Sequence, residues 1–369
     1  MFKKAVWPLL VLLLTLLCFF GLSLIQHVRH EEISPKKKRS ADKGFYVTAY
    51  VVQTPSFFNR LKTEAKQAGL NTIVVDAKHF LEGELLLLVK ARKCLPGIRV
   101  SGDEYFTKVI KGLQKEGFIV SARIVVFKDD HLVIARPDLG IRVKSEKKEG
   151  GVDLYQDLKG GKWADPYNAE VRLYNALIAE RAALCGVDEV QFDYIRFPAE
   201  RRARETIYPG YQEGKSKIDM IEAFLSDVRQ RLKKYNVSIA VDIFGVTAWQ
   251  SKNDIASLGQ DLKRLAKHID VISPMLYPSH FHAGYDGFAN PGSEPYYFVA
   301  AGIKKTREIL STEAVAVVPW IQGFNLRSPN YGPQYIADQV KACKDAGATG
   351  YLIWNASNRY ETAFSGLRN

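Results

Sequence analysis

Short apolar runs recur along the chain and alternate with longer amphipathic segments. Eight such runs lie at residues 45–52, 71–76, 119–126, 187–192, 237–244, 271–276, 314–321 and 350–354. Most of them are rich in Val and Ile and continuous rather than alternating, which is typical of parallel strands buried on both faces. We therefore expect the core of the protein to be a parallel sheet.

The segments between the runs have the periodicity of amphipathic helices. We expect helices at 56–68, 105–116, 168–184, 217–235, 253–266, 295–310 and 332–346, several of them ended by a glycine such as Gly69 or Gly347. Eight strands alternating with helices predict an α/β protein closed as a (β/α)8 TIM barrel. The alternative is an open doubly wound sheet, but the turn at residues 50–53 lacks the glycines of a phosphate-binding loop.

The amino terminus has a different pattern. Lys3 and Lys4 precede an almost unbroken apolar stretch at residues 5–25, which is long enough to cross a bilayer and is followed by no small-residue cleavage site. We expect residues 1–25 to be an uncleaved, single-pass signal-anchor in the membrane, residues 26–43 a basic linker, and residues 44–369 the barrel. Positive charge lies on both sides of the span, so charge alone does not set the orientation.

Composition narrows the class of protein. The net charge is +12, with 47% hydrophobic and 25% charged residues, which is typical of a globular protein. The charge, part of it in the basic loop at residues 201–204, leaves polyanion binding as an alternative, but no nucleic-acid motif accompanies it. Three cysteines remain outside the apolar stretch, and their spacing fits neither a disulfide framework nor a zinc site. We expect no cofactor and no nucleic-acid partner.

Polar and aromatic side chains gather where the predicted strands end. In a TIM barrel these ends form the catalytic face, and a mixture of aromatic rings with carboxylate, amide and guanidinium groups suits a sugar. Long loops at 128–168, 197–215 and 277–294 follow three of the strands, and the last, which carries His280, is rich in aromatic residues; we expect such loops to wall a groove. The strand-end residues are Asp76, Lys78, Arg123, Gln191, Asp193, Arg196, Asp242, Tyr277, Trp320, Gln322, Trp354 and Asn355.

Two of the carboxylates are candidates for catalysis. Asp193 shares strand parity with Gln191, so both side chains can point to one side of the sheet, and Asp242 ends the next strand. Glycoside hydrolysis uses such a pair, and the charge of one carboxylate raises the pKa of the other. The structural alternatives are an ion pair of Asp193 with Arg196, and a strand-end cap or an ion pair for Asp242. For Asp76, an ion pair and a substrate contact are equally compatible with the sequence.

Other chemistries have weaker support. His280 and His282 could bind a metal, as in a metal-dependent hydrolase or deacetylase, but their loop supplies no third ligand at a diagnostic spacing. We therefore expect no metal site. A serine hydrolase would need a G-x-S-x-G elbow, which the chain does not contain.

Several motifs, in order, resemble the bacterial DUF4015 family of glycoside-hydrolase-like domains. The hallmark is Gln191-Phe192-Asp193-Tyr194-Ile195-Arg196-Phe197-Pro198. The others lie at residues 44–49, 122–129, 163–167, 241–245, 273–280, 319–322 and 354–360, so that the resemblance covers residues 44 to the end.

The resemblance implies a TIM barrel of the α-amylase-like superfamily, with the nucleophile ending strand four and the acid/base ending strand five. Carried over, these are Asp193 and Asp242, although the superfamily acid is more often Glu. We therefore expect an extracytoplasmic, membrane-tethered glycosidase that cleaves a bacterial envelope or extracellular polysaccharide. The alternative is a non-catalytic carbohydrate-binding barrel.

Overall fold

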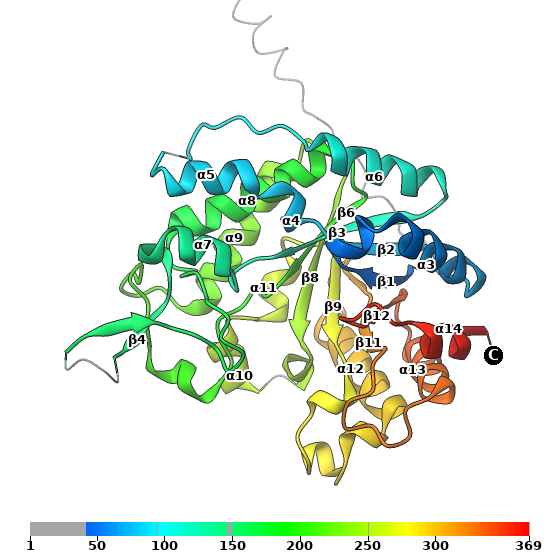
Figure 1. The fold of residues 1–369 in the computed structure, drawn as a ribbon. Coiled ribbons are helices and arrows are strands. Elements are labelled where there is room, and N and C mark those ends of the chain that lie inside the picture. The colour runs from blue at the N-terminus through cyan, green and yellow to red at the C-terminus, as the bar shows by residue number, and fades with distance from the viewer. Residues whose placement is uncertain (1–41, 94, 146–149, 250, 369) are drawn as a thin grey trace, which may run out of the picture. The chain divides into compact units, whose positions relative to one another are not determined.

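The computed structural model describes residues 42–93, 95–145, 150–249 and 251–368, which form a closed parallel barrel (Figure 1). The strand order is β1-β2-β3-β6-β8-β9, then β10 and β11, then β12, which pairs back with β1. The predicted (β/α)8 barrel is thereby confirmed. The strands are β1 Lys43–Val47, β2 Thr72–Asp76, β3 Ile119–Val125, β6 Glu189–Asp193, β8 Ser238–Phe244, β9 Val271–Met275, β10 Ala316–Val317, β11 Trp320–Gln322 and β12 Tyr351–Trp354.

The seventh position of the barrel is shared by two short strands. Pro319 lies between β10 and β11 and has no N–H to donate to a sheet ladder. The backbone nevertheless stays in register, because Val318 N donates to Ile272 O (3.0 Å) and Leu352 N donates to Pro319 O (2.8 Å). The predicted strand at 314–321 is thus a single strand that is interrupted at Pro319. Both of its parts pair with β9, and β11 also pairs with β12.

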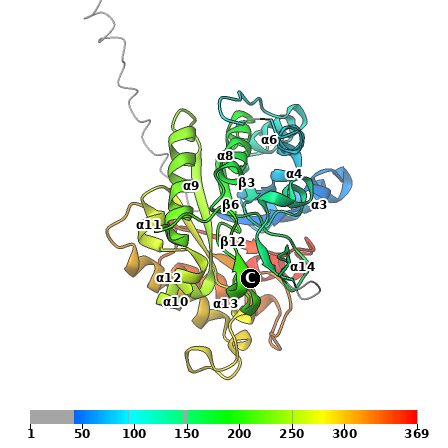
Figure 2. The same cartoon turned by 90° about the vertical axis from the view of Figure 1, so that its left-hand side faces the viewer.

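Helices surround the strands (Figures 1 and 2). The expected helix at 253–266 is in fact two helices, because Gly259 takes the left-handed conformation (φ 76°) and Asp261 caps a new helix. The main helices are α3 Pro55–Gln67, α6 Glu104–Lys115, α8 Ala169–Leu184, α9 Lys217–Leu232, α10 Lys252–Leu258, α11 Leu262–Ala266, α12 Pro295–Ile309, α13 Pro333–Asp345 and α14 Glu361–Arg368.

The first strand is shorter than predicted. It ends at Val47, because Thr48 accepts a hydrogen bond from Val51 N and caps the helix α2 Ala49–Val52. The prediction of a strand over 45–52 was therefore wrong beyond Val47. The sequence patterns also did not predict the helices α4 Lys78–Leu81, α5 Gly83–Lys90, α7 Asp130–Ala135 and α14.

Two of the long loops are joined by a small sheet of their own. The strands β4 Arg142–Lys144, β5 Val152–Leu154 and β7 Thr206–Ile207 form a small antiparallel sheet, which joins the loop after β3 to the loop after β6. Short 3-10 helices occupy other loops: η1 Pro137–Leu139, η2 Arg201–Glu205, η3 Gly245–Trp249, η4 Pro278–His280, η5 Tyr285–Gly287 and η6 Pro291–Ser293.

The alternation of side chains along β6 separates the outer layer from the barrel interior. Phe192 points outward and packs against Phe224 of α9, with ring centroids 5.3 Å apart. Gln191 and Asp193 point inward, where they contact Asp242 and Arg123. The predicted parity of Gln191 and Asp193 is confirmed, and it brings polar groups into an interior otherwise packed with residues such as Tyr46, Val74, Trp320 and Leu352.

The expected signal-anchor at residues 1–25 and most of the basic linker at 26–43 lie outside the described residues, and the domain boundaries remain predictions. Within the part of the chain that the structure describes, no helix has both the length and the apolar character needed to cross a bilayer. Cys185 and Cys343 are buried and free, as expected of small apolar side chains.

Candidate functional site

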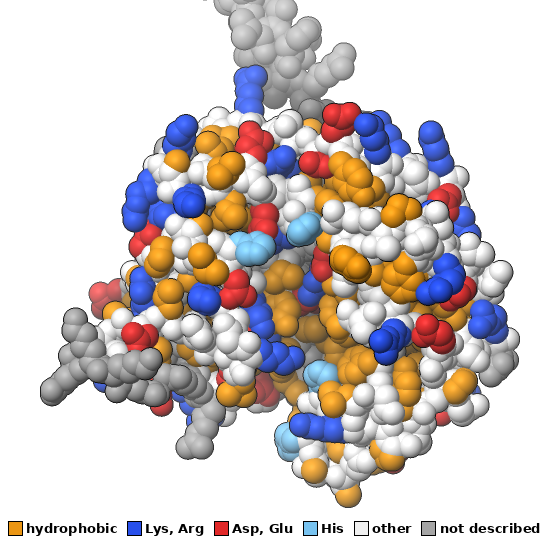
Figure 3. Space-filling model, viewed as in Figure 1, with side chains coloured by type: hydrophobic (Ala, Val, Ile, Leu, Met, Phe, Trp, Pro, Cys, Tyr) orange, Lys and Arg blue, Asp and Glu red, His pale blue; other side chains and the backbone are white. Residues whose placement is uncertain are grey.

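A cavity of about 440 Å³ lies at the carboxyl ends of the barrel strands. Figure 3 shows that this view of the molecule is hollowed near its centre, with hydrophobic side chains deep in the hollow and Lys and Arg side chains beside it. The residues that line the cavity are Arg123, Lys159, Asp193, Tyr194, Arg196, Asp242, Phe244, Gly245, Val246, Met275, Tyr277, His280, Phe281, Trp320, Trp354 and Ala356.

Asp193 lies at the last position of β6 and is held by charged and backbone donors. Arg123 donates to its Oδ2 through Nε (3.0 Å) and Nη2 (2.5 Å). The backbone N–H of Tyr194 donates to Oδ1 (2.6 Å), and Tyr194 adopts a left-handed conformation (φ 50°). These donors fix the orientation of the carboxylate toward the cavity.

Asp242 lies in β8 in a much less polar setting. It is 1% exposed, and its Oδ1 accepts hydrogen bonds from Gln191 Nε2 and Trp320 Nε1, both at 2.7 Å. Burial first, and the charge of Asp193 second, raise the pKa of Asp242 well above its usual range. The two carboxylates therefore differ in their surroundings: Asp193 is bonded to a guanidinium, whereas burial favours the protonated form of Asp242.

Arg123 connects the acidic groups of the site. It forms ion pairs with Asp193 and with Asp76, and Asp76 also accepts a hydrogen bond from the Tyr46 hydroxyl. The guanidinium carbon lies 4.9 Å from the ring centroid of Trp354 and 5.3 Å from that of Tyr46. Of the two interpretations of Asp76, the structure shows the ion pair. Asp193 pairs with Arg123 and not with Arg196.

The structure divides the other predicted binding residues into two groups. Arg196, Tyr277, His280, Trp320 and Trp354 line the cavity, and burial lowers the pKa of His280. The second group, Gln191, Gln322 and Asn355, is buried behind the wall and holds it in place. Gln191 bonds to Asp242, and Gln322 bonds to Ser279 and Ser328 in two loops. Asn355 donates to Gly323 O and Arg359 O.

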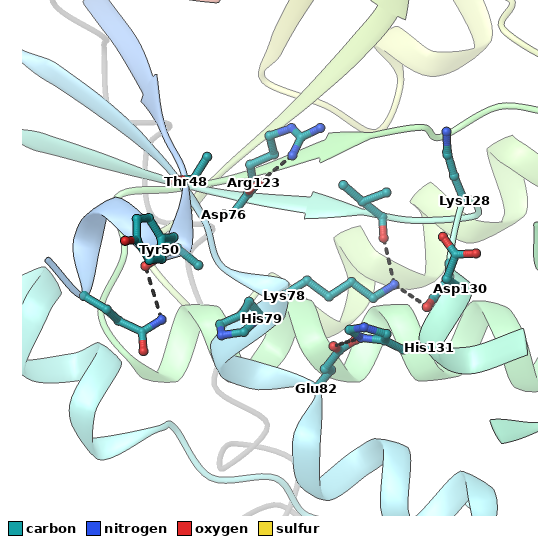
Figure 4. Close-up of a pocket in the computed structure, with 14 residues that line it drawn as sticks. Thr48, Tyr50, Asp76, Lys78, His79, Glu82, Arg123, Lys128, Asp130 and His131 are labelled. Atoms are coloured by element: carbon teal, nitrogen blue, oxygen red, sulfur yellow. Dashed lines mark hydrogen bonds and ion pairs between the residues drawn. The ribbon is translucent and has the colours of Figure 1, made fainter. Parts of the chain in front are cut away.

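A second cavity, of about 500 Å³, lies beside the first and shares Arg123 with it (Figure 4). Asp76 and Lys78 line this second cavity rather than the first. The Lys78 ammonium donates to Val125 O (2.7 Å), Asp129 Oδ2 (2.6 Å) and Asn175 Oδ1 (2.9 Å). Since an ammonium has three N–H groups, these bonds leave none for a sugar hydroxyl, although the sequence placed Lys78 among the strand-end residues that suit a sugar.

The aromatic loop at 277–294 walls the cavity less than expected. Tyr277, His280 and Phe281 reach it, whereas Phe288 packs against Tyr297 of α12, with centroids 4.4 Å apart. The sequence patterns did not single out Lys159 or Phe244 as lining residues. Phe244 closes its strand and could have been found by that signal, but Lys159 is brought in only by the folding of the long loop after β3.

The histidines of the same loop do not form a metal centre. Within the described residues, no group of three or more His, Cys, Asp or Glu side chains is arranged to hold a metal ion. His280 Nδ1 lies 3.1 Å from Ser279 Oγ, and His282 Nδ1 lies 2.9 Å from Ala283 O.

Comparison with solved structures finds barrels of the same kind. The glycoside hydrolase domain of PgaB (BpsB) from Bordetella bronchiseptica is similar with a TM-score of 0.56 and 14% identity, over 87% of this chain and 95% of that one. An endo-beta-1,4-mannanase from Thermotoga petrophila is similar with a TM-score of 0.56 and 12% identity, over 90% and 76% of the two chains. At these identities the similarity extends to the fold alone.

A hypothetical protein from Ruminiclostridium thermocellum shares 27% identity over 53% of this chain and 96% of that one, with a TM-score of 0.41. No curated protein matches the chain. Residues 44–360 match the family DUF4015, described as "Putative glycosyl hydrolase domain". Because this match extends over most of the sequence, the chain belongs to the DUF4015 family of glycosyl hydrolase domains.

Proposed function

We propose that the protein is a glycoside hydrolase that cleaves a polysaccharide with the carboxyl groups of Asp193 and Asp242. The observation that carries the proposal is the contrast between these two groups. Asp193 is held by Arg123, while burial raises the pKa of Asp242. A protonated acid beside an ionised carboxylate is the arrangement that glycosidic bond cleavage requires.

In the retaining form of the reaction, the Asp193 carboxylate attacks the anomeric carbon while Asp242 donates its proton to the departing glycosidic oxygen. The C–O bond breaks and a covalent glycosyl–Asp193 ester forms. Asp242, now a carboxylate, then takes a proton from water, which attacks the anomeric carbon and releases Asp193. No further cofactor enters this scheme.

Other residues at the cavity and behind its wall have supporting roles in the proposal. Trp354 and Tyr277 offer aromatic faces for sugar rings, while Trp320 and Gln191 orient Asp242 through its Oδ1. Arg123 orients Asp193 and balances its charge before the attack. The apolar stretch at residues 5–25 supports the further proposal that the barrel is tethered to the membrane and acts outside the cytoplasm on an envelope or extracellular glycan.

The test is release of reducing ends by the full-length protein from α- and β-linked bacterial envelope glycans. We expect Asp193→Asn to lower kcat by about 1,000-fold or more and to leave glycan affinity in place, because the nucleophile acts only in the transition state. Asp227→Asn, which changes an exposed carboxylate on α9, is the matched control and retains full activity.

Equal release by Asp193→Asn and the unchanged protein contradicts the nucleophile assignment. If the unchanged protein releases nothing while both proteins bind the same glycan, the alternative of a carbohydrate-binding barrel replaces the hydrolase.

A further inference from the structure

Arg196 is a buried cation at the wall of the cavity. Its side chain follows β6, is 9% exposed, and lines the cavity beside Asp193 and Asp242. The guanidinium carbon lies 4.6 Å from the ring centroid of Phe244, 5.1 Å from that of Trp163 and 5.2 Å from that of Tyr194. These rings hold the guanidinium in place and offset part of the cost of burying its charge.

No carboxylate of the described structure forms an ion pair with this cation, although Asp193, Glu200 and Asp157 act on it from a longer distance. Among the described residues, Arg196 donates one hydrogen bond, from Nη1 to Phe197 O (3.0 Å), and no Asp or Glu lies within ion-pair distance of it. Its other guanidinium nitrogens have no hydrogen-bond partner among the described residues, and they are not completely buried. Because Arg196 lines the cavity, its free N–H groups can bond to a molecule that enters there.

A second cation shares the cavity. Lys159 lies in the loop after β3, is exposed, lines the same cavity, and forms no ion pair among the described residues. Lys128, which lines the second cavity, is different because it pairs with Asp157 at 2.7 Å. Lys159 also lies near enough to His280 for its charge to lower the pKa of that imidazole, after the larger effect of burial.

The local charges do not cancel. The single positive charge of Arg123 is shared between the two carboxylates of Asp76 and Asp193, and Asp242 favours its neutral form. Arg196 offsets the remaining negative charge, and Lys159 then leaves the cavity with one positive charge in excess. A buried, unpaired cation is costly, and a guanidinium with free N–H groups is best satisfied by an oxyanion that accepts two of its hydrogen bonds.

We propose that the cavity binds a sugar residue carrying an oxyanion, a carboxylate or an ester phosphate, with Arg196 and Lys159 as the residues that recognise it. This inference rests on the proposed function and names the substrate class of the same site: an acidic glycan rather than a neutral one.

The experiment measures binding of acidic sugars and their neutral parents to the full-length Asp193→Asn protein, by thermal shift and calorimetry. The probes are glucuronate and galacturonate, glucose 6-phosphate, and glucose and galactose, with sodium chloride equalising the ionic strength. At least one acidic probe is expected to raise the melting temperature where its parent does not, because ligands of the native state stabilise it. The carboxylate and phosphate probes distinguish the two kinds of oxyanion.

Arg196→Gln is then expected to weaken the acidic probe by about 30-fold or more, because it removes a buried partner of a charge. Arg196→Lys keeps the charge and restores part of the affinity. Lys159→Gln is expected to give a smaller loss, and it tests the inference if Arg196→Gln does not fold. Lys111→Gln removes an exposed lysine of α6 and leaves binding unchanged.

Failure of every acidic probe to exceed its neutral parent, or equal binding by Arg196→Gln, overturns the inference. Hydrolysis of neutral glycans with no acidic preference overturns it while leaving the proposed function in place. Acidic binding without hydrolysis of any acidic glycan contradicts the proposed function instead, and leaves a binding site.

Discussion

Asp193 and Asp242 are chemically identical side chains in different surroundings. Asp193 accepts two hydrogen bonds from the positively charged Arg123 guanidinium. Asp242 accepts hydrogen bonds from neutral donors, Gln191 and Trp320, and is almost fully buried at the wall of the cavity. The division of labour between nucleophile and acid in the proposed reaction therefore depends on the neighbours of each carboxylate and not on residue type.

The pH dependence of the reaction tests this division. The raised pKa of Asp242 sets the alkaline limb of the kcat/KM profile, since the acid must be protonated to act. The Trp320 N–H lowers that pKa by bonding to the charged form, so Trp320→Phe is expected to raise it and move the alkaline limb to higher pH by about one unit.

The control for this shift is Trp354→Phe, which changes another indole of the same cavity without a hydrogen bond to Asp242 in the described structure. It is expected to weaken substrate binding and leave the alkaline limb where it is. A limb that stays in place in Trp320→Phe, or moves to lower pH, contradicts the role of Asp242 as the acid.

At the scale of elements, the end of β8 approaches β9 so closely that only glycine fits. A Cβ on Gly245 would collide with the carbonyl oxygen of Met275 in β9, and Gly245 itself lines the cavity. The same closeness brings Asp242, which precedes this turn in β8, into the ladder opposite Ser273. The position of the proposed acid thus depends on the contact between two neighbouring strands.

Gly245→Ala is therefore expected to lower the free energy of unfolding by about 1–3 kcal/mol, as overpacking against a rigid backbone does, and to lower activity as well. The matched control is Gly112→Ala in α6, where a Cβ meets nothing within 4 Å. That change is expected to stabilise the protein by about 0.4–1 kcal/mol. Urea unfolding of both variants measures the difference, and equal effects of the two would contradict the close approach.

At the scale of the whole molecule, the barrel is closed by the first and last parts of the described chain. β1 pairs with β12, and α14 adds Phe364, whose ring lies 5.7 Å from that of Phe45 and stacks on Tyr360 at 5.3 Å. The Tyr360 hydroxyl in turn donates to Tyr46 O (2.7 Å). The C-terminal helix thus supports the strand that carries Tyr46, a partner of Asp76 in the site.

Phe364→Ala is expected to destabilise the folded protein by about 3–5 kcal/mol, since it empties a fully buried aromatic site at the closure of the barrel. Leu87→Ala, at a position 68% exposed, is the control and changes stability by less than about 0.5 kcal/mol. Chemical denaturation followed by tryptophan fluorescence measures both. A small effect of Phe364→Ala would show that α14 is dispensable for closure.

Much of the fold could be predicted from local patterns. The eight apolar runs indicated the parallel strands in their order, because strands covered on both faces must be apolar throughout. The period of two along β6 predicted that Gln191 and Asp193 point the same way. The strand after Val47 was mispredicted, since the apolar run at 49–52 suits a short helix as well as a strand and the Thr48 cap decides between them.

By itself, the sequence determined the order of strands and helices, the family, and the set of polar residues that reach one end of the barrel, because these follow from spacing along the chain. The tertiary structure decided the partners. Arg123 bridges Asp76 and Asp193, Lys78 is saturated by Asp129 and its neighbours, and Trp320 of β11 bonds to Asp242 of β8 across the intervening strand β9. These pairings join strands that are far apart in the sequence, so they depend on the alignment of the strands when the barrel closes. The burial that raises the pKa of Asp242 depends on the same closure.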